Sequence, residues 1–337
     1  MNSIAPWWLP GGHAQTLWPA LQARHTSTQA TTPVKYLRER WSTPDNDFID
    51  VDWQDAPANS PAPTPLLVLF HGLEGSSRSH YALAFARYAH SCGLAFAVPH
   101  FRGCSGEINH APRAYHSGDF EEVGWILQRL RQRTGRPLLV VGVSLGGNAL
   151  LRWAQEAGSQ AAEVASAVAS ISAPVDLAAS GDALGRGFNR WVYTPMFLNS
   201  MKPKAMKKLA QHPGLFNPGK LLAARTLYEF DNIFTAPLHG FKNTDDYWQR
   251  ASAKPQLARL KIPSLLVNAQ NDPFIPAACL PRIAAKGGNV ELWQPQHGGH
   301  VGFVQGPWPG HIHALPVAVL GWLAQQSHLT LKAQQNG

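Results

Sequence analysis

The chain has 337 residues, of which 45% are hydrophobic and 15% charged, a composition that is typical of a globular protein with a large core. Its formal net charge is +8, but the basic residues are scattered. The densest basic cluster consists of Lys202, Lys204, Lys207 and Lys208. We interpret this cluster as a solvated face. The charge therefore gives no reason to expect a nucleic-acid partner.

The cysteines and the N-terminal segment indicate in which cellular compartment the protein resides. Cys92, Cys104 and Cys279 cannot all pair within one chain, and they form no C-x-x-C zinc motif. The N-terminal segment has neither the basic region nor the apolar run of a signal peptide. No stretch approaches the roughly 18 continuous apolar residues of a membrane span. We expect a cytoplasmic protein without stable membrane insertion, whereas the sequence does not indicate an oligomeric state.

The predicted elements begin with two strands, at residues 35–41 and 48–53. Polar and apolar residues alternate in the second, from Ile49 to Trp53, so we predict an antiparallel pair at a sheet edge. The proline-rich residues 56–65 that follow are expected to form a loop.

From residue 66 onward, short apolar runs alternate with segments of helical spacing. The runs that have the length of a buried strand are 66–70, 94–98, 138–143, 167–171, 264–267 and 290–293. Helices are expected at residues 79–90, 120–133, 148–157 and 316–325. This alternation predicts an α/β fold with a mostly parallel, doubly wound sheet that is covered by helices on both faces.

The alternation stops at residues 177–254, which contain glycines, prolines and short apolar groups but no convincing strand. We expect one domain over residues 1–337, with short helices at 177–254 inserted as a lid. Because this stretch lies between two sheet strands, it should project over their carboxyl edge, where a doubly wound sheet holds its site. Asp176 is expected to cap the first of these helices.

The sequence LLVVGVSLGGN, at residues 138–148, predicts a strand, a tight turn and a helix. Its G-x-S-x-G pattern is that of a nucleophile elbow, in which a strained turn exposes a serine, here Ser144. The flanking Gly142 and Gly146 are a steric requirement, because a Cβ at either position would crowd the turn. The pattern arises by chance in roughly one chain in seven of this composition, so the catalytic partners of the serine decide the interpretation.

A nucleophilic serine requires an acid that orients its base. Asp272 follows the strand at 264–267 and precedes Pro273, which places it on the loop rim beside the elbow. Asp176 also follows a strand and is the rival candidate. We favour Asp272 as the acid.

The candidate base lies in the sequence HGGHVGF. His300 is favoured over His297, since its glycine neighbour lets the loop approach Ser144. These histidines, with His311 and His313, could instead hold a metal ion, but no carboxylate or cysteine stands beside them at ligand spacing. We therefore expect no metal.

The loop after the strand at 66–70 reads His71-Gly72-Leu73-Glu74-Gly75. A strand followed by H-G-x-x-G is the expected place of an oxyanion donor. We predict that the backbone N–H groups of Leu73 and Leu145 form the oxyanion hole, and that the His71 side chain holds the loop. Cys104 lacks a strand-turn-helix setting and is expected to contribute packing.

Seven ordered stretches together resemble the YheT-like α/β-hydrolases, a family that includes embryogenesis-associated proteins and abhydrolase-domain lipases. They are GGHAQTLWP, HGLEGSSRSHY, HFRGCSGEIN, VGVSLGGNALL, RTLYEFDNIFTAPLHGF, NAQNDPFIP and GGHVGF. Because they are spread between residues 11 and 303, the resemblance extends over most of the chain. The resemblance implies an α/β-hydrolase fold without a cofactor, with Ser144 as nucleophile, Asp272 as acid and His300 as base. Asn271 departs from the family, in which many members carry a second acidic residue at this position.

The resemblance also implies ester hydrolysis. The leading prediction is a serine carboxylic-ester hydrolase that acts through an acyl-enzyme on acyl esters, with lipid-like esters among the candidates. The membrane anchor of the animal relatives is not recognised here, so we expect a smaller or more soluble substrate. Two alternatives are an acyltransferase with the same triad and a non-catalytic binding module on a hydrolase fold.

Two aromatic groups allow more than one interpretation. Phe230, Phe234, Phe241 and Tyr247 are expected to tie the predicted lid to the sheet, and the alternative is that they line an acyl-chain site. Near the N-terminus, Trp7, Trp8 and Trp18 form either a wedge packed on the body or a surface for peripheral lipid contact.

Overall fold

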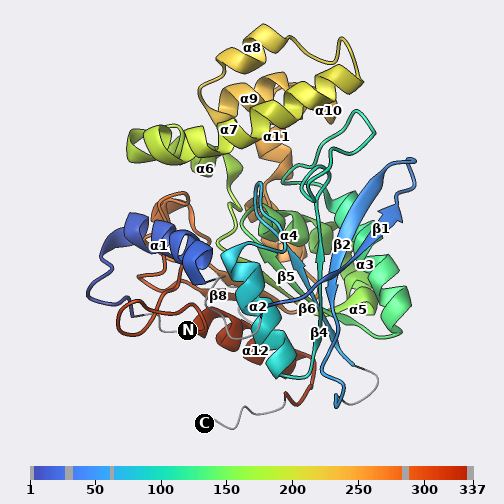
Figure 1. Cartoon of the computed structure of the whole chain (residues 1–337), viewed down its shortest axis with the longest axis vertical. Helices are drawn as coiled ribbons and strands as arrows, with labels where there is room; N and C mark the ends of the chain where they lie inside the picture. The colour runs from blue at the N-terminus through green and yellow to red at the C-terminus, as the bar shows by residue number, and fades with distance from the viewer. Residues whose placement is uncertain (1–3, 27–32, 61–63, 283–287, 332–337) are drawn as a thin grey trace.

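The computed structural model describes residues 4–26, 33–60, 64–282 and 288–331. Its centre is an eight-stranded sheet with the strand order β1-β2-β4-β3-β5-β6-β7-β8 (Figure 1). The strands are β1 (Leu37–Ser42), β2 (Phe48–Gln54), β3 (Leu66–Phe70), β4 (Ala95–Pro99), β5 (Leu138–Val143), β6 (Ala165–Ile171), β7 (Ser264–Val267) and β8 (Val290–Trp293).

The predicted sheet topology is confirmed. β2 pairs antiparallel with both β1 and β4, whereas every neighbouring pair from β4 to β8 is parallel. All residues of β3 and β5 are buried, because helices cover both faces of a central parallel strand and favour a continuous apolar run. For this reason the bounds of both strands could be read from the sequence.

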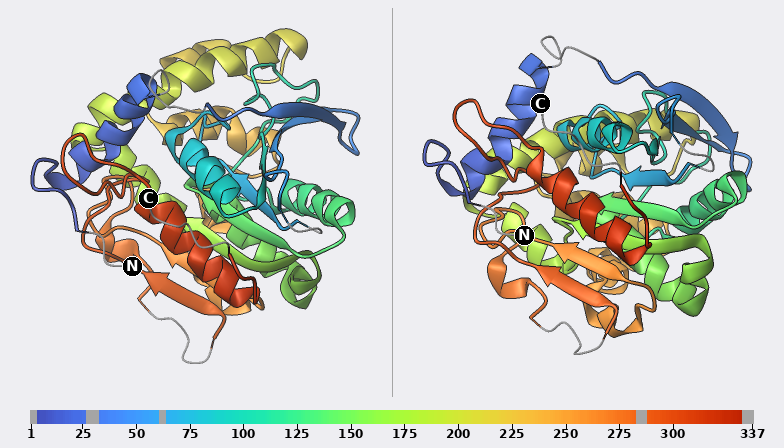
Figure 2. Two further views of the ribbon diagram at one scale, coloured as in Figure 1. Left: turned by 60° about the horizontal axis from the view of Figure 1, so that its bottom comes forward. Right: turned by 90° about the horizontal axis from the view of Figure 1, so that it is seen from below.

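The helices that cover the sheet form two layers (Figure 2). One face packs against α3 (Phe120–Thr134), α4 (Leu145–Ala157) and α5 (Ala161–Val164). The other face packs against α2 (His80–Ser91) and α12 (Ala314–Gln326). α4 begins three residues before the predicted start, because the helix continues directly from the turn at Ser144.

A group of helices joins β6 to β7 and lies beyond the carboxyl ends of the parallel strands, at the top of Figure 1. They are α6 (Leu177–Leu184), α7 (Gly187–Gln211), α8 (Pro218–Ala223), α9 (Leu227–Ile233), α10 (Thr235–Leu238) and α11 (Thr244–Ala251). α7 has 25 residues, so the prediction of short helices is wrong for this element. The Asp176 carboxylate accepts a hydrogen bond from the Ala179 N–H at 3.2 Å, which confirms its role as the cap of α6.

The helix α1 (Gly11–Thr26) was not predicted. It carries Pro19 in its interior and lacks a regular apolar stripe, so the usual sequence signals of a helix are weak. Three short 3₁₀ turns complete the secondary structure of the described residues, at Gly158–Gln160, Lys254–Arg259 and Ala277–Cys279.

The predicted solvated basic face is wrong for most of its members. Lys208 is only 3% exposed and donates hydrogen bonds to two backbone carbonyl groups. Lys204 forms an ion pair with Glu74, at 2.8 Å between Nζ and Oε2, and Lys202 donates to two further carbonyl groups. Lys207 is exposed as expected.

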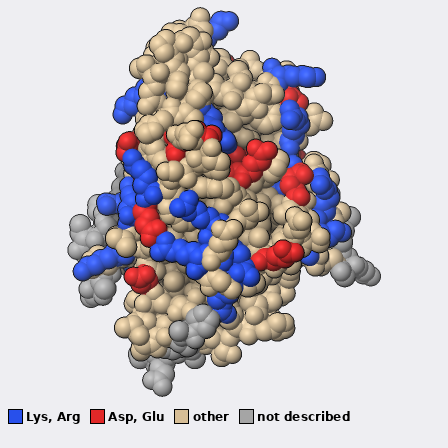
Figure 3. All heavy atoms as spheres, turned by 90° about the vertical axis from the view of Figure 1, so that its right-hand side faces the viewer, with Lys and Arg blue, Asp and Glu red and all other residues tan. Residues whose placement is uncertain are grey.

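Charged side chains of both signs alternate on the face shown in Figure 3. β1, β2 and α3 lie on this side of the molecule, and their ion pairs include Arg38 with Asp52 and Arg133 with Glu39. Acidic side chains lie beside the basic ones in this view. Across the described residues, no helix has the length and apolar character required to cross a bilayer.

Candidate active site

Ser144 occupies a strained turn between β5 and α4. Its backbone has φ 53° and ψ −121°, a left-handed conformation that is unfavourable for a residue with a side chain. The Ser144 N–H donates to the carbonyl oxygen of Ile171 at 2.8 Å. A Cβ on Gly146 would lie 2.5 Å from the His71 carbonyl oxygen, and one on Gly142 would lie 2.5 Å from the Gly146 carbonyl oxygen. The turn therefore has the steric requirement predicted from the G-x-S-x-G pattern.

His300 bridges Ser144 and Asp272. Its Nε2 lies 3.0 Å from the Ser144 Oγ, and its Nδ1 lies 2.8 Å from the Asp272 Oδ2. The Asp272 side chain is fully buried, and its Oδ1 accepts the Phe274 N–H at 2.8 Å. The structure thus brings together the three side chains selected from the sequence. The rival histidine, His297, is exposed.

The rival acid, Asp176, lies outside this arrangement. Besides capping α6, its carboxylate forms an ion pair with Lys254 at 3.1 Å. Its position after β6 resembles that of Asp272 after β7, so the order of elements alone could not separate the two residues.

The loop that carries His300 is held by α1, a contact that was not predicted from the sequence. The Thr16 Oγ1 accepts the His300 backbone N–H at 2.8 Å. The Gln15 Oε1 accepts the Gly298 N–H and the Asn271 side-chain amide, each at 2.9 Å. Gln15 therefore joins the loop of the candidate base to the loop of the candidate acid.

Glycines allow α1 to approach these loops closely. A Cβ on Gly12 would lie 1.8 Å from the Asn271 carbonyl oxygen, and one on Gly302 would lie 2.0 Å from the Gln15 carbonyl oxygen. Both glycines belong to the stretches GGHAQTLWP and GGHVGF. The glycines of the two stretches were thus the only sequence signal of this contact.

The loop after β3 forms a turn from Gly72 to Gly75. The Gly75 N–H donates to the Gly72 carbonyl oxygen, and the Gly72 N–H donates to the Tyr81 hydroxyl, each at 2.9 Å. Glu74, the third residue of the turn, has φ 56°. Leu73 and Leu145 line the same cavity as Ser144 and His300.

Each of the two predicted oxyanion donors carries a backbone N–H group without a hydrogen-bond partner among the described residues. Leu145 is the first residue of α4, where an N–H has no partner within the helix. Among the described residues, the Leu73 N–H donates to no other group. Two such N–H groups beside a nucleophile can stabilise a developing oxyanion.

Two side chains beside these turns have structural roles, as predicted. Burial lowers the pKa of His71 to about 3, so its ring is neutral. The ring accepts the Phe101 N–H at 3.1 Å and donates to the Gly72 carbonyl oxygen at 2.8 Å, which holds the loop. Burial raises the pKa of Cys104 to about 12, and this thiol packs against the core.

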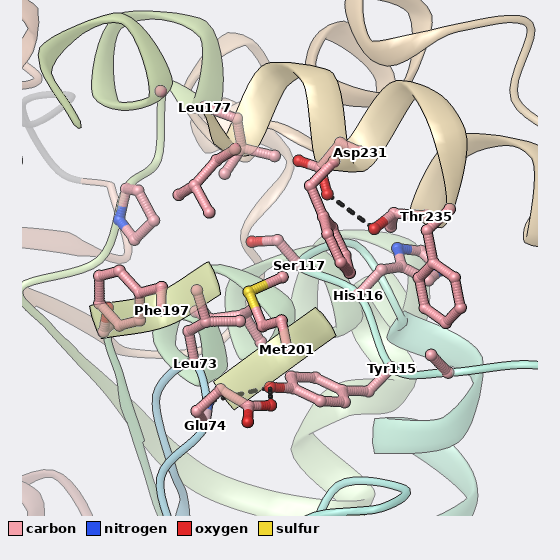
Figure 4. Close-up of a pocket in the computed structure, with 18 of the residues that line it drawn as sticks. Leu73, Glu74, Tyr115, His116, Ser117, Leu177, Phe197, Met201, Asp231 and Thr235 are labelled. Atoms are coloured by element: carbon pink, nitrogen blue, oxygen red, sulfur yellow. Dashed lines mark hydrogen bonds between the residues drawn. The ribbon is translucent and has the colours of Figure 1, made fainter. Parts of the chain in front are cut away.

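A mostly apolar cavity of about 160 Å³ is lined by Ser144 and by residues of the helices α6, α7 and α9. Figure 4 shows Leu177, Phe197, Met201 and Asp231 around this cavity. Its apolar lining includes Leu73, Leu145, Leu177, Phe197, Met201, Phe230, Phe234 and Phe274. A second groove reaches Ser144 and His300 from the side of α1, α2 and α7. Ser144 and His300 thus line both the cavity and the groove.

The aromatic residues of the segment from α9 to α11 lie at or beside the cavity. Phe230, Phe234 and Tyr247 line the cavity. The Tyr247 hydroxyl accepts the Ser117 N–H at 2.9 Å, which joins α11 to the loop before α3. Phe241 packs on the Tyr247 ring, with 5.1 Å between the ring centroids.

The tryptophans near the N-terminus are divided between the two interpretations. Trp8 and Trp18 pack edge to face, with 5.7 Å between their ring centroids, and both contact Trp308. They form a wedge on the body of the protein. Trp7 is 92% exposed and is not part of this wedge.

A buried carboxylate on the cavity wall was missed in the sequence. Asp231 accepts hydrogen bonds from the Thr235 hydroxyl at 2.6 Å and from the Trp248 Nε1 at 3.0 Å. Burial raises its pKa to about 6. Asp231 lies in the stretch RTLYEFDNIFTAPLHGF, but nothing in the sequence indicates that its carboxylate is removed from water. Within the described parts of the chain, no group of three or more His, Cys, Asp or Glu residues is placed to hold a metal ion.

A family model described as the alpha/beta hydrolase fold matches residues 65–307, which is more than half of the chain. The chain belongs to this family. The predicted fold is confirmed, and among solved structures this α/β-hydrolase resembles a bacterial membrane phospholipase A with a TM-score of 0.52 at 19% identity, covering 90% of this chain and 92% of that chain.

The resemblance to the YheT-like proteins is also confirmed. The α/β-hydrolase is 39% identical to the Escherichia coli protein named "Putative esterase YheT", over 87% of this chain and 84% of the relative. It is 31% identical to phospholipase ABHD3 of Mus musculus, over 82% of this chain and 68% of the relative. It is 26% identical to the embryogenesis-associated protein EMB8 of Picea glauca, over 86% of this chain and 67% of the relative.

Proposed function

We propose that the protein is a serine carboxylic-ester hydrolase that acts through an acyl-enzyme. The observation that carries this proposal is the hydrogen-bonded chain from the Ser144 Oγ through the His300 ring to the buried Asp272 carboxylate. Relatives named as esterase and phospholipase support the same class of reaction.

Each group has a defined step. The Ser144 Oγ attacks the ester carbonyl carbon while the His300 Nε2 takes its proton, and the N–H groups of Leu73 and Leu145 stabilise the oxyanion. The tetrahedral intermediate then collapses, and His300 gives the proton to the leaving alcohol. Water attacks the acyl-enzyme while His300 takes one of its protons. The second tetrahedral intermediate then collapses and releases the acid as His300 returns this proton to the Ser144 Oγ. Asp272 holds the imidazole in orientation and stabilises its charged form.

The cavity supports an acyl ester as the substrate class. Its wall is mostly apolar and one end reaches Ser144, so an acyl chain can leave water there while its carbonyl group meets the serine. Much of the wall comes from α6 to α11, including Leu177, Met201 and Phe230. We therefore assign the segment 177–254 as a lid over the acyl site.

Hydrolysis of p-nitrophenyl esters of several chain lengths tests the proposal. Ser144→Ala should lower kcat by about 10⁴-fold or more, because the nucleophile is lost. Labelling by a fluorophosphonate probe should disappear in the same variant. Ser91→Ala, at an exposed serine of α2, is the matched control and should keep both activities. Equal labelling of wild type and Ser144→Ala would contradict the assignment of the nucleophile.

A further inference from the structure

Glu74 stands at a position where the backbone favours glycine. It is the third residue of the Gly72–Gly75 turn and has φ 56°, a conformation that is unfavourable for a residue with a side chain and costs glycine nothing. Glu74 directly follows Leu73, which supplies one N–H of the proposed oxyanion hole. A glutamate at this position is thus tolerated only if the contacts of its side chain offset the backbone cost.

The Glu74 carboxylate is bonded on both oxygens, and its side chain is only 10% exposed (Figure 4). Oε1 accepts the Tyr115 hydroxyl at 2.9 Å. Oε2 accepts the Ser200 hydroxyl and lies 2.8 Å from the Lys204 Nζ. Ser200 and Lys204 are four residues apart and lie on one face of α7, so the turn is tied to this helix by two side chains.

Tyr115 binds Glu74 at its backbone as well as at its carboxylate. Its hydroxyl accepts the Glu74 backbone N–H at 2.9 Å while it donates to the Glu74 carboxylate. The Tyr115 ring stacks on Phe101, with 5.3 Å between centroids and 9° between the planes. Burial raises the pKa of Tyr115 well above its usual value, so the hydroxyl remains a donor. Backbone and side chain of Glu74 are therefore fixed together.

We propose that Glu74 is a positioning residue, which sets the direction of the Leu73 N–H and does so only while α7 lies against the turn. The inference rests on the proposed function. If α7 moves away, the Glu74 carboxylate loses Ser200 and Lys204, and the contacts that offset the left-handed backbone are weakened. The turn then relaxes and Leu73 no longer points at the oxyanion.

This arrangement links the acyl chain to the chemical step. Phe197 and Met201 lie on α7 between or beside the residues that bind Glu74, and both line the cavity. An acyl chain that packs against them holds α7 in place, and α7 holds the oxyanion turn. Ester hydrolysis therefore increases in kcat, and not only in affinity, when the acyl chain is long enough to reach these two side chains.

Substitutions at Glu74 separate this role from that of an ordinary turn residue. Glu74→Gly keeps the turn, because glycine adopts φ 56° without cost, but it removes the tie to α7. We expect kcat for a p-nitrophenyl ester to fall by about 10- to 100-fold with KM changed less than about twofold, since a displaced oxyanion donor acts on the transition state. Glu74→Gln should behave in the same way. Lys204→Met should lower kcat by a smaller factor, about fivefold.

The affinity for a trifluoromethyl ketone gives a second measurement, because the serine adduct of this inhibitor places an oxyanion in the hole. It should fall in proportion to kcat in each variant. Lys207→Met removes an exposed lysine of α7 and is the control, with kcat and inhibitor affinity unchanged. Thermal unfolding by circular dichroism confirms that each variant is folded, and Glu74→Gly carries the test if Glu74→Gln unfolds.

Two outcomes distinguish the inference from the proposed function. If the wild type hydrolyses esters and Glu74→Gly keeps its kcat and inhibitor affinity, Glu74 is only a turn residue and the inference is overturned. If the wild type hydrolyses no ester and takes no fluorophosphonate label, the proposed function fails, and the inference fails with it.

Discussion

The sheet and the helices α6 to α11 place side chains at the same cavity by different forces. Ser144 follows a strand whose six residues are all buried, and the turn itself is fixed by close backbone packing. On the helical side, buried or half-buried polar groups make the contacts: Asp231 with Trp248, Lys204 with Glu74, and Lys208 with backbone carbonyl groups.

This difference predicts that the geometry of the two regions responds differently to pH and to the loss of a side chain. Apolar packing is non-directional and does not depend on pH, so the geometry contributed by the sheet is fixed once the core has formed. The strength of an ion pair or of a charged hydrogen bond depends on the protonation state of its groups and on the presence of both partners. The helices α6 to α11 are therefore the part of the site whose geometry responds to conditions, and the following experiments test that division.

The largest effect is expected on the sheet side, at the candidate acid. Asp272→Asn should lower kcat by roughly 10³- to 10⁴-fold with little loss of stability, because the His300 ring loses the group that fixes its tautomer. Asp176→Asn is the matched control, since it follows the neighbouring strand but caps α6. It should change kcat less than twofold and stability by about 1 kcal/mol or less. A larger loss of kcat in Asp176→Asn than in Asp272→Asn would reverse the assignment.

The elbow should be intolerant of a single methyl group. In Gly146→Ala the added Cβ would lie 2.5 Å from the His71 carbonyl oxygen and 2.6 Å from that of Phe70, and backbone atoms cannot move aside. We expect a loss of about 3 kcal/mol or more in the free energy of unfolding, measured by urea denaturation. Gly321→Ala, in α12, should gain about 0.5–1 kcal/mol, because its Cβ would lie within 4 Å of no atom beyond its chain neighbours and the adjacent backbone of its own helix. Equal stability of the two variants would show that the turn is not sterically fixed.

The smallest expected effect lies on the helical side and depends on pH. Burial raises the pKa of Asp231 from 3.8 to about 6, so the folded state binds this proton more tightly than the unfolded chain. Below about pH 4, Asp231 is protonated in both states and does not lower the free energy of unfolding. As the pH rises from about 4 to about 6, the free energy of unfolding falls by up to about 3 kcal/mol. Asp231→Asn does not titrate. The difference in unfolding free energy between wild type and this variant should therefore shift in favour of the variant from pH 4 to pH 7, and parallel pH curves would contradict the prediction.

The sequence predicted the sheet side better than the helical side. The bounds of β3, β5 and β7 agree with the predicted ranges, because buried parallel strands appear as short apolar runs between helices. The bounds of the edge strand β8 agree as well, although its residues are only partly buried or exposed. Ser144, Asp272 and His300 could be selected because each follows a strand directly or sits in a loop with glycine neighbours. Topology then places the ends of these strands together.

The contacts that depend on side-chain burial could not be predicted in the same way. Lys208 and Asp231 are charged residues for which the sequence alone predicts exposure. The packing of α7 buries Lys208, and the packing of α9 removes the Asp231 carboxylate from water. α1 was missed because its sequence contains an internal proline and no apolar stripe. Its partners, such as the loop of His300, are so distant in the chain that no local pattern connects them.

The contact between α1 and the His300 loop also bears on how the protein is made. The hydrogen bond from the His300 N–H to Thr16 joins residues that are 284 positions apart. A ribosome therefore releases α1 long before the loop that it supports exists. Contacts between residues so far apart in the chain form late in folding, because a large loop must be closed, at a cost in entropy, before these contacts contribute any stability. We expect the nascent chain to gain its sheet first and to become competent for labelling at Ser144 only after the last part of the chain has emerged.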